Sequence, residues 1–405
     1  MAPPRNVREI IQTLNGCQYD AFIVGGCVRD FLMGKTPKDW DIATSATPPQ
    51  VKSLFARTFD TGAAHGTITV LLRGMGCEVT TFRIDGAYTD SRRPDSVRFT
   101  SDLEADLARR DFTMNAIAYH ETQGFVDPFG GMADIRARLI RGVGEPSARF
   151  GEDALRMMRA VRFSAQLGFD IEAETYKALA AQAALLAKIS VERVRDEWVK
   201  TLLADNPQQM RLLTKTALLS SVHAETAAFL QSRWDAVLPR VMHAERDLLS
   251  RLSLLFMDFE TAQMQNTLKF FKFDNHTVKE VSALVRLMNT AIADDDYAVR
   301  HIVREYGHKR LARALVLKSI AADENEVAKT AVAKVSARRT RIEANGDCCH
   351  LADLAINGGK LKQLGIPPGK VMGETLNALL EAVLRDPSKN EAATLEALAV
   401  TCLPT

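Results

Sequence analysis

The spacing of apolar and polar residues differs between the first third of the chain and the rest. Before about residue 135, the apolar run Ala21 to Val24 is typical of a buried strand, and strands are also expected over Thr67 to Leu72 and over the alternating stretch Glu78 to Ile84. Helical spacing predicts short helices over Val7 to Leu14 and Pro49 to Ala56. From about residue 147 onward only helical spacing remains. We therefore expect an α+β protein, with a mixed α/β domain followed by all-α domains.

Sequences that break helices divide the helical part of the chain. Asp205-Asn206-Pro207 and Asn345-Gly346-Asp347 each place turn-forming residues after a helical pattern. A third boundary is expected near residue 140, where the strand patterns end. The chain is long enough for several cores, because it has 405 residues. We predict four domains, over residues 1–140, 141–205, 206–345 and 346–405.

Two aspartates follow a glycine turn near the N-terminus. Gly25-Gly26 lets the backbone come close to a ligand, and the helix expected over Val28 to Met33 would attract phosphate at its start. Trp40 to Ala43 is expected to be a strand, so that Asp39 and Asp41 would point to one side of it. Carboxylate oxygens are ligands that Mg²⁺ prefers. Each feature alone fits a plain turn or a solvated strand face, but the combination predicts a site for a triphosphate and a metal.

Two further segments carry candidate site residues. Glu78 lies on a neighbouring predicted strand, where it would support the metal site or face solvent. Arg110 is followed by a carboxylate and an amide, Asp111 and Asn115, and such a set suits a phosphate and ribose hydroxyls. Arg110 is our candidate for a nucleotide contact. Asp111 and Asn115 also fit a role in capping the next helix.

One amphipathic helix is expected over Gly151 to Phe163. Its apolar residues fall on one side and its charged residues on the other. Asp153 and Arg156 are three residues apart and are neighbours on such a helix. From spacing alone, a weak salt bridge within the helix is the simplest interpretation.

The charge of the chain is local rather than global. The formal net charge is +2 and the sequence pI is about 8.2, so a nucleic-acid surface would have to be a patch. Arginine is dense in one stretch, which favours a polyanion channel over ordinary surface charge. These arginines are Arg136, Arg138, Arg141, Arg149, Arg156, Arg159 and Arg162.

The cysteines and the N-terminal residues predict the cellular location of the protein. None of the six cysteines forms a CxxC pair, which fits reduced thiols, and charges interrupt the first apolar residues, so no secretory segment is expected. No stretch approaches the length of about 20 apolar residues that spans a membrane. We expect a cytoplasmic protein with no membrane partner. The oligomeric state is left open, a homodimer included.

Three segments together resemble the class II tRNA nucleotidyltransferases and bacterial poly(A) polymerases. Gly25 to Asp30 with Asp39-Trp40-Asp41 is similar to the signature of the family's head domain, and Arg109 to Ala116 is similar to its RRDFTxNA motif. Glu152 to Phe163 is similar to its EDxxRxxRxxRF motif. The resemblance implies a nucleotidyltransferase head followed by helical neck, body and tail domains. It also implies nucleotide binding by Gly25, Gly26, Arg29, Arg110, Asp153, Arg156, Arg159 and Arg162.

The activity that the resemblance implies is addition of CCA to the 3′ end of tRNA from CTP and ATP, with pyrophosphate released. Asp39 and Asp41 would be catalytic and would hold two Mg²⁺ ions. Asp153 and Arg156 would select the base, the first accepting from an exocyclic amino group and the second donating to the adjacent ring nitrogen. Cytosine and adenine fit this pair. Uracil and guanine present the reverse pattern and leave both protein groups unpaired.

The remaining segments are interpreted more loosely. Residues 85–94 resemble the flexible loop of enzymes that add CCA or A, Ile189 to Trp198 resembles a motif that braces the neck, and Lys360 to Lys370 fits either an RNA phosphate contact or an interdomain turn. An A-adding enzyme or a poly(A) polymerase shares the head motifs and stays an alternative. A catalytically silent tRNA-binding protein is the alternative from another class, which the intact Asp39 and Asp41 disfavour.

Overall fold

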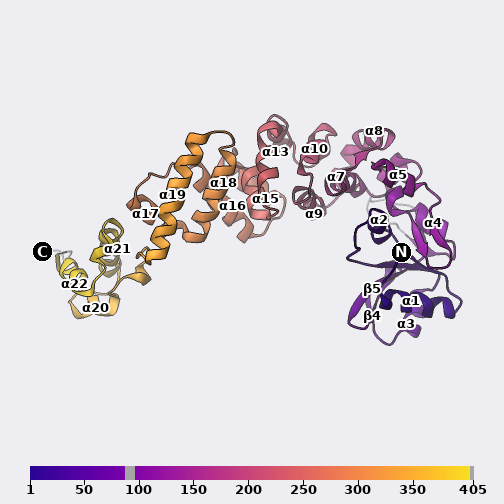
Figure 1. Ribbon diagram of the computed structural model, residues 1–405, viewed down its shortest axis with the longest axis horizontal. Coiled ribbons are helices and arrows are strands. Elements are labelled where there is room, and N and C mark those ends of the chain that lie inside the picture. Colours follow the sequence, from indigo (N-terminus) through magenta and orange to yellow (C-terminus); the bar gives the residue numbers. More distant parts are fainter. Residues whose placement is uncertain (87–95, 402–405) are drawn as a thin grey trace. The chain divides into compact units, whose positions relative to one another are not determined.

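A computed structural model describes residues 1–86 and 96–401 (Figure 1). The chain forms two compact units, Met1–Trp234 and Asp235–Thr405. The first unit combines a mixed sheet with helices, and the second consists of helices in the part that the structure describes. The α+β fold class predicted from the sequence is confirmed.

The first unit is built on a seven-stranded mixed sheet in the order β3-β4-β5-β2-β1-β8-β9. Only β2 and β5 pair in parallel, and the other neighbours are antiparallel. The strands are β1 (Ala21–Val24), β2 (Asp41–Thr44), β3 (Thr58–Gly62), β4 (Thr67–Leu72), β5 (Met75–Thr81), β8 (Ala118–His120) and β9 (Gly124–Val126).

The register of the central strands brings the candidate site residues to one edge. Val24, the last residue of β1, is opposite Asp41 at the start of β2, so the glycine turn after β1 lies beside that aspartate. On the other side, Glu78 of β5 is the partner of Asp41. A core that includes Phe22, Ala43 and Leu107 packs against this part of the sheet. The sheet is therefore a rigid base for the groups at its edge.

Local elements differ from the predictions in a few places. β1 and β4 have the predicted bounds, whereas β2 begins one residue later than expected, at Asp41. The strand predicted over Glu78 to Ile84 is wrong, because β5 ends at Thr81 and Arg83–Asp85 forms a separate strand, β6, paired with β7 (Val97–Phe99). The buried Phe82 separates the two strands.

Short helices surround the sheet. They are α1 (Arg5–Gly16), α2 (Gly26–Leu32), α3 (Pro48–Leu54), α4 (Leu103–Ala108) and α5 (Gly131–Ala137). The helices expected near the N-terminus are present with shifted ends, and α2 starts at Gly26 rather than Val28. α4 ends at Ala108, directly before Arg109 and Arg110.

The single helix expected over Gly151 to Phe163 is wrong. The chain instead forms α6 (Pro146–Glu152) and α7 (Leu155–Leu167), with Asp153 in an extended conformation between them. The Asp153 carboxylate accepts a hydrogen bond from the backbone N–H of Leu155 at 3.0 Å. Such a side chain competes with the helix for backbone donors, and this gives a physical reason for the break.

The rest of the first unit is helical apart from one short strand. β11 (Asp170–Ile171) pairs in parallel with β10 (Leu139–Ile140), a pairing that the sequence pattern did not predict. The helices that follow α7 are α8 (Ala173–Gln182), α9 (Val191–Leu202), α10 (Arg211–Lys215), α11 (Leu218–Val222) and α12 (Ala224–Gln231). α7 and α9 contact each other closely, which places residues of α9 near the break at Asp153.

The second unit contains helices whose described residues include two hydrophobic clusters with no residue in common. One core includes Val299, Leu311 and Ile342, and the other includes Leu361 and Leu380. Its α-helices are α14 (Leu248–Leu255), α15 (Thr261–Phe270), α16 (Asn275–Asn289), α17 (Asp296–Tyr306), α18 (His308–Ala321), α19 (Glu326–Asn345), α20 (Gly358–Gln363), α21 (Lys370–Arg385) and α22 (Ala392–Thr401), while α13 (Trp234–His243) begins at the boundary.

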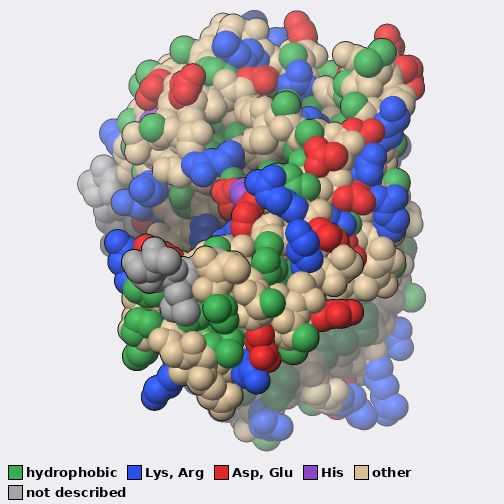
Figure 2. Space-filling view, turned by 90° about the vertical axis from the view of Figure 1, so that its left-hand side faces the viewer, with side chains coloured by type: hydrophobic (Ala, Val, Ile, Leu, Met, Phe, Trp, Pro, Cys, Tyr) green, Lys and Arg blue, Asp and Glu red, His purple; other side chains and the backbone are tan. Residues whose placement is uncertain are grey.

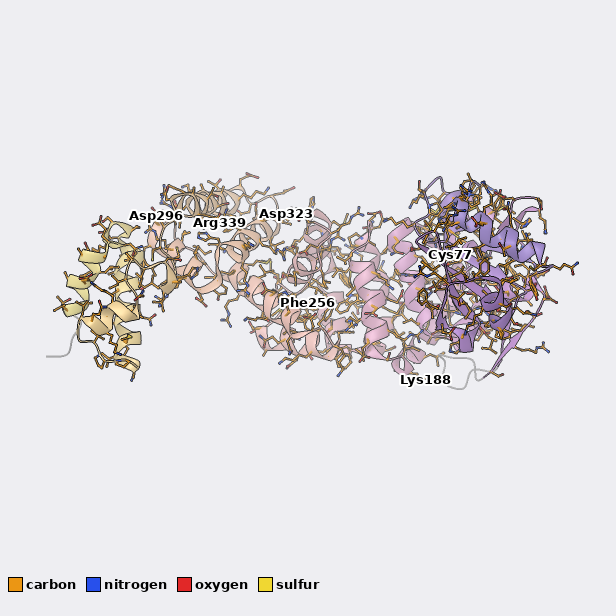
Figure 3. All side chains as sticks on the ribbon, turned by 90° about the horizontal axis from the view of Figure 1, so that it is seen from below. Cys77, Lys188, Phe256, Asp296, Asp323 and Arg339 are labelled. Atoms are coloured by element: carbon orange, nitrogen blue, oxygen red, sulfur yellow. The ribbon has the colours of Figure 1, made fainter. Side chains whose placement is uncertain are left out.

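Some side chains of the second unit illustrate its packing and its surface. Phe256, which follows α14, is fully buried, while Asp296 of α17 pairs with arginines of α19 (Figure 3). α19 ends where the sequence predicted a break, with Gly346 in a left-handed conformation.

Lysine and arginine side chains are interspersed with acidic ones on the face shown in Figure 2. No helix in the described residues has the length and apolarity to span a membrane.

The four-domain division remains a prediction. The structure separates two compact units at Trp234, which is a coarser division than the four ranges.

Candidate active site

A cavity of about 500 Å³ lies within the first unit, beside the start of β2. It is bounded by the turn between β1 and α2, the segment after α4, the break between α6 and α7, and α9. Eight residues predicted from the sequence line it: Gly25, Gly26, Arg29, Asp41, Arg110, Asp153, Arg156 and Arg159. Six others do so as well: Arg109, Asp111, Asn115, Leu155, Phe163 and Arg193. Asp39, Glu78 and Arg162 are not among the lining residues.

Gly25 is required by both conformation and space. Its φ of +77° is a left-handed value that favours glycine. A Cβ atom at this position would lie 3.2 Å from Nη1 of Arg110 and 3.7 Å from Oδ2 of Asp41. The guanidinium and the carboxylate therefore converge over a backbone that has no side chain of its own.

Three carboxylates influence one another at the start of β2. Burial raises the pKa of Asp41, the negative charges of Glu78 and Asp39 raise it further, and Arg110 opposes them. Asp39 is exposed and lies in a bend before β2, so the prediction that a strand carries both aspartates is wrong. Glu78 is also exposed, yet it is the register partner of Asp41 in a parallel pair, so the two side chains share a face of the sheet.

A divalent cation fits this set of donors. The acids repel one another, and a bound cation would relieve the repulsion. The described residues contain no group of three or more His, Cys, Asp or Glu side chains arranged to hold a metal by themselves. In many nucleotide sites, one or two carboxylates bind Mg²⁺ together with substrate phosphates.

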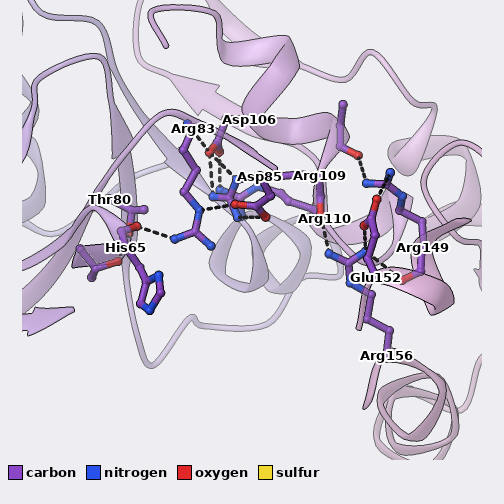
Figure 4. Close-up of polar contacts among 12 residues, drawn as sticks. His65, Thr80, Arg83, Asp85, Asp106, Arg109, Arg110, Arg149, Glu152 and Arg156 are labelled. Atoms are coloured by element: carbon purple, nitrogen blue, oxygen red, sulfur yellow. Dashed lines mark hydrogen bonds and ion pairs between the residues drawn. The ribbon is translucent and has the colours of Figure 1, made fainter. Parts of the chain in front are cut away.

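A buried carboxylate that the sequence analysis missed, Asp106, holds two of the arginines (Figure 4). Its side chain is 1% exposed, and it accepts hydrogen bonds from Arg109 at 2.7 Å and from Arg110 at 3.0 Å. Burial would raise the pKa of Asp106, but the charges and hydrogen bonds of Arg110 and Arg109 lower it below the usual value. Asp106 precedes the arginines by three and four residues, and this spacing was the available signal.

Asp111 and Asn115 brace arginines instead of capping an α-helix. Asp111 forms an ion pair with Arg159 at 2.6 Å and accepts a hydrogen bond from the Asn115 amide at 3.0 Å. The side-chain oxygen Oδ1 of Asn115 accepts a hydrogen bond from Arg29 at 2.8 Å. Burial acts to raise the pKa of Asp111, but Arg159 and Asn115 lower it to about 2. The capping role expected for these residues is wrong, because a short 3₁₀ helix without a side-chain cap follows, over Thr113–Asn115.

The structure contains no ion pair between Asp153 and Arg156 within the described residues. Arg156 pairs with Glu152 at 2.7 Å and donates to the backbone oxygens of Arg149 and Arg109 at 3.2 and 2.8 Å (Figure 4). Asp153 contacts Arg193 at 3.3 Å instead. The predicted salt bridge between Asp153 and Arg156 is therefore wrong, because the helix is broken between the two residues.

Phe163 lies beneath three arginine side chains at the cavity wall. The guanidinium carbons of Arg29 and Arg159 are each 5.2 Å from the centre of its ring, and that of Arg162 is 4.3 Å away. Arg162 itself pairs with Glu197 at 3.0 Å and is 9% exposed. Burial and the neighbouring charge of Arg159 lower the pKa of Arg162 to about 10. Arg162 thus supports the wall rather than lining it.

The arginine-rich stretch is mostly paired. Five of its members form ion pairs with acids of the first unit, namely Arg141, Arg149, Arg156, Arg159 and Arg162. The arginine-rich stretch therefore does not form a channel wall as a whole. Of its seven arginines, Arg156 and Arg159 line the cavity. In the loop predicted over residues 85–94, Asp85 ends β6 and Gly86 follows it, and the remainder lies outside the described residues.

Three family models match the chain. Residues 21–141 match the poly A polymerase head domain, and residues 168–230 match the probable RNA and SrmB-binding site of polymerase A. Residues 245–399 match the model described as tRNA nucleotidyltransferase domain 2, putative. Together these matches cover most of the chain.

Curated relatives align along nearly the whole chain. A CCA-adding enzyme of Lactiplantibacillus plantarum is 39% identical over 388 residues, which cover 95% of this chain and 93% of that protein. The CCA-adding enzyme of Geobacillus stearothermophilus is 39% identical over 399 residues, which cover 96% of this chain and 95% of that protein.

Solved structures give the same match. The CCA-adding enzyme of Bacillus stearothermophilus in complex with CTP has a TM-score of 0.81 and 34% identity, covering 99% of this chain and 98% of that one. The Thermotoga maritima CCA-adding enzyme complexed with tRNA has a TM-score of 0.64 and 19% identity, covering 98% and 95% of the two chains, and shows a shared fold.

Proposed function

Because the chain belongs to the family of CCA-adding enzymes, we propose that its cavity binds CTP and ATP and transfers their nucleotides to tRNA. The protein is a nucleotidyltransferase that adds CCA to the 3′ end of tRNA without a nucleic-acid template. In each step the tRNA 3′-oxygen bonds to the α-phosphorus of the nucleotide, the bond to the β-phosphate breaks, and pyrophosphate leaves with its electrons. The observation that carries the proposal is the convergence of Asp41 and Arg110 over Gly25.

The metal that we propose is Mg²⁺, held by Asp39 and Asp41, with Glu78 as support. The raised pKa of Asp41 and the repulsion from the other two acids support this choice, because a cation would stabilise all three charges. Bound Mg²⁺ would lower the pKa of the 3′-hydroxyl of the primer and would neutralise charge on the triphosphate. Gly25 and Gly26 would let the triphosphate approach the backbone, while Arg29 and Arg110 would donate to its oxygens.

Arginines on the other walls would hold the nucleotide and select its base. Asp111 and Asn115 hold Arg159 and Arg29 in place through ion pairs and hydrogen bonds, so these cations are oriented before the ligand arrives. Asp153 would accept from the amino group of cytosine or adenine, and Arg156 would donate to the adjacent ring nitrogen. Arg162 would act indirectly, by packing on Phe163.

The partners that follow are tRNA, CTP and ATP. A cytoplasmic location stays a prediction from the cysteines, and a homodimer stays open. The range 346–405 is proposed as a tRNA-binding tail, supported by its position within the match to tRNA nucleotidyltransferase domain 2.

The test uses transcribed tRNA that ends at the discriminator base, with Mg²⁺ and CTP alone, ATP alone, or both. Products are resolved to one nucleotide. We expect CTP alone to add two residues and the mixture to add three and stop. Addition of a single A only to tRNA that already ends in CC would indicate an A-adding enzyme, a long A ladder would indicate a poly(A) polymerase, and binding without any addition would indicate a silent tRNA-binding protein.

The metal identity is tested in the same assay. Dialysis against EDTA should abolish addition, and Mg²⁺ should restore it, whereas Ca²⁺ should restore it poorly because its larger, flexible coordination shell positions phosphates less strictly. Full activity after EDTA treatment would contradict the metal proposal.

A further inference from the structure

Arg193 enters the cavity from α9, a helix whose sequence predicted only a bracing role. It lies in the first turn of that helix and lines the same cavity as Asp153 and Arg156. The Nη2 atom of Arg193 is 3.3 Å from Oδ2 of Asp153, a contact between residues 40 positions apart in the chain. The base-selecting acid therefore has a fixed cationic neighbour.

The Asp153 carboxylate is held at both oxygens. Oδ1 accepts the backbone N–H of Leu155 at 3.0 Å, and Oδ2 accepts from Arg193. Two different donors, one on α7 and one on α9, fix the plane of a carboxylate that would otherwise rotate about its side-chain bonds. Each oxygen keeps a further lone pair for a ligand.

Arg193 has donor capacity that the fold does not use. Its Nη1 atom is buried and has no hydrogen-bond partner within the described residues. Buried donors in proteins are nearly always paired, so a side chain placed only to brace the fold would be expected to satisfy both nitrogens. A donor left over at the wall of a nucleotide cavity indicates that the guanidinium serves the ligand or the groups that contact it.

We propose that Arg193 is a positioning residue that determines base specificity by fixing the orientation of the Asp153 carboxylate. With one oxygen held from α7 and the other from α9, the remaining lone pairs of Asp153 point in a fixed direction and accept from the exocyclic amino group of cytosine or adenine. The carbonyl oxygen of uracil or guanine meets only an acceptor at that place, so these bases are rejected as long as Asp153 is held. This inference rests on the proposed function of the cavity.

Arg195 offers a matched control on the same helix. It is two residues further along, it pairs with Asp196 at 2.8 Å, and it does not line the cavity. The variants are Arg193→Ala, Arg193→Lys and Arg195→Ala. Lysine retains a charge and a donor but lacks the planar fork of arginine, so it tests whether the charge alone is enough.

The measurement is the ratio of kcat/KM for CTP to that for UTP on tRNA ending at the discriminator base, and for ATP to GTP on tRNA ending in CC. Loss of a charged hydrogen bond predicts a roughly tenfold or larger fall in both ratios for Arg193→Ala. Arg193→Lys should restore part of the selectivity, and Arg195→Ala should leave both ratios unchanged. Melting temperatures of all variants are recorded, and equilibrium binding of CTP and UTP without tRNA provides a second readout that does not depend on turnover.

A double-mutant cycle with Asp153→Ala decides whether Arg193 acts through Asp153. If it does, adding Arg193→Ala to Asp153→Ala changes selectivity no further. Equal slowing with CTP and UTP, or unaltered selectivity in both assays, would overturn the inference while leaving the proposed function intact. Absence of any CMP addition by the wild-type protein would instead overturn the proposed function itself.

Discussion

The two compact units place their charges differently. In the first unit, acids that hold arginines beside the cavity are buried: the side chain of Asp106 is 1% exposed and that of Asp111 is 9% exposed. In the second unit, pairs such as Arg341 with Asp296 and Arg385 with Glu381 lie on the helix surfaces. Surface pairs contribute little to stability, whereas buried pairs fix geometry at a cost in desolvation. Burial of several ion pairs at one place therefore marks where geometry matters.

One buried pair in the second unit refines this comparison. Arg300 and Asp347 are each 9% exposed at the side chain, their atoms are 2.7 Å apart, and Arg300 also donates to the backbone oxygen of Leu384. The pair ties α17 to the segment after α19 and to the end of α21. This pair borders none of the residues predicted to be catalytic, so a single buried ion pair can serve the fold alone. Several buried pairs around one cavity indicate an active site.

Cavity size alone gives a misleading comparison. An apolar cavity of about 390 Å³ in the second unit is lined mainly by alanine and aliphatic side chains of α16, α18 and α19. Its one charged residue, Lys318, donates to the backbone oxygen of Thr290, and burial lowers the pKa of this lysine. This cavity offers no set of polar groups to a nucleotide, although it is nearly as large as the one in the first unit.

The largest expected effect comes from removing a proposed metal ligand. Asp41→Ala and Asp39→Ala should reduce nucleotide addition below detection, because the cation loses a charged oxygen ligand. Single-turnover addition to labelled tRNA measures this, and filter binding should show tRNA affinity largely retained. Asp60→Ala is the control, since Asp60 is an exposed acid of the same sheet that pairs with Lys52. Retained turnover in Asp41→Ala would exclude the metal role.

The next effect separates a buried pair at the cavity from its counterpart elsewhere. Asp111→Asn leaves the Arg159 guanidinium without its counter-charge, which should cost about 3 to 5 kcal/mol of stability in the first unit. It should also weaken CTP binding, because Arg159 is no longer held at the wall. Thermal unfolding and equilibrium dialysis with CTP measure the two effects. Normal CTP affinity in the variant would show that Arg159 is positioned without Asp111.

Asp347→Asn is the matched change in the second unit. It leaves Arg300 buried without its partner, so a stability loss of similar size, about 3 to 5 kcal/mol, is expected. At a temperature where the variant is folded, CTP affinity and the preference for CTP over UTP should equal those of the wild type. A changed nucleotide preference would show that a buried ion pair in the second unit also affects nucleotide selection.

The pH dependence of Asp111 gives a smaller, graded effect. Its pKa in the folded protein is about 2, below the ordinary value, so the ionised form stabilises the fold. This contribution, roughly 2 kcal/mol, is complete above about pH 5 and is lost as the pH falls toward the folded pKa. The difference in melting temperature between wild type and Asp111→Asn should therefore shrink between pH 5 and pH 3. A constant difference over that range would contradict the lowered pKa.

The smallest effect is expected for a surface pair of the second unit. Arg385→Ala removes the ion pair between Arg385 and Glu381, in which the Arg385 side chain is 64% exposed. The change in the free energy of unfolding should stay within about 0.5 kcal/mol, and added salt should reduce it further. Urea unfolding at low and high salt measures this, and a loss of several kcal/mol would show that exposure is a poor guide to the value of these pairs.

Much of the architecture was predictable from local patterns. The sequence located β1 and β4 with their observed bounds, because the fully buried β1 is an uninterrupted apolar run and the half-buried β4 alternates its buried residues. Gly25 was also accessible from the sequence, since a left-handed turn after a strand favours glycine. Asp106 was missed, although its spacing of three and four residues from Arg109 and Arg110 within the sequence was a usable signal.

Other features had no local signal. The break at Asp153 depends on a competition between helix propagation and a side-chain hydrogen bond, and periodicity does not report which of them prevails. The partners of the arginines are similarly non-local: Asp111 and Arg159 are 48 residues apart, and Asp153 and Arg193 are 40 apart. The packing of α7 against α9, and the contact of α7 with the segment after α4, bring these groups together.

By itself the sequence determined the α+β class, the glycine turn and the types of residues that carry the chemistry, because these depend on side-chain pattern and backbone preference over a few residues. Tertiary structure alone decided which acid holds which arginine, that Glu78 is aligned with Asp41, and that Arg193 rather than Arg156 contacts Asp153. Electrostatic and hydrogen-bond partners require contact within a few ångströms, and such contacts arise from folding of distant segments onto one another.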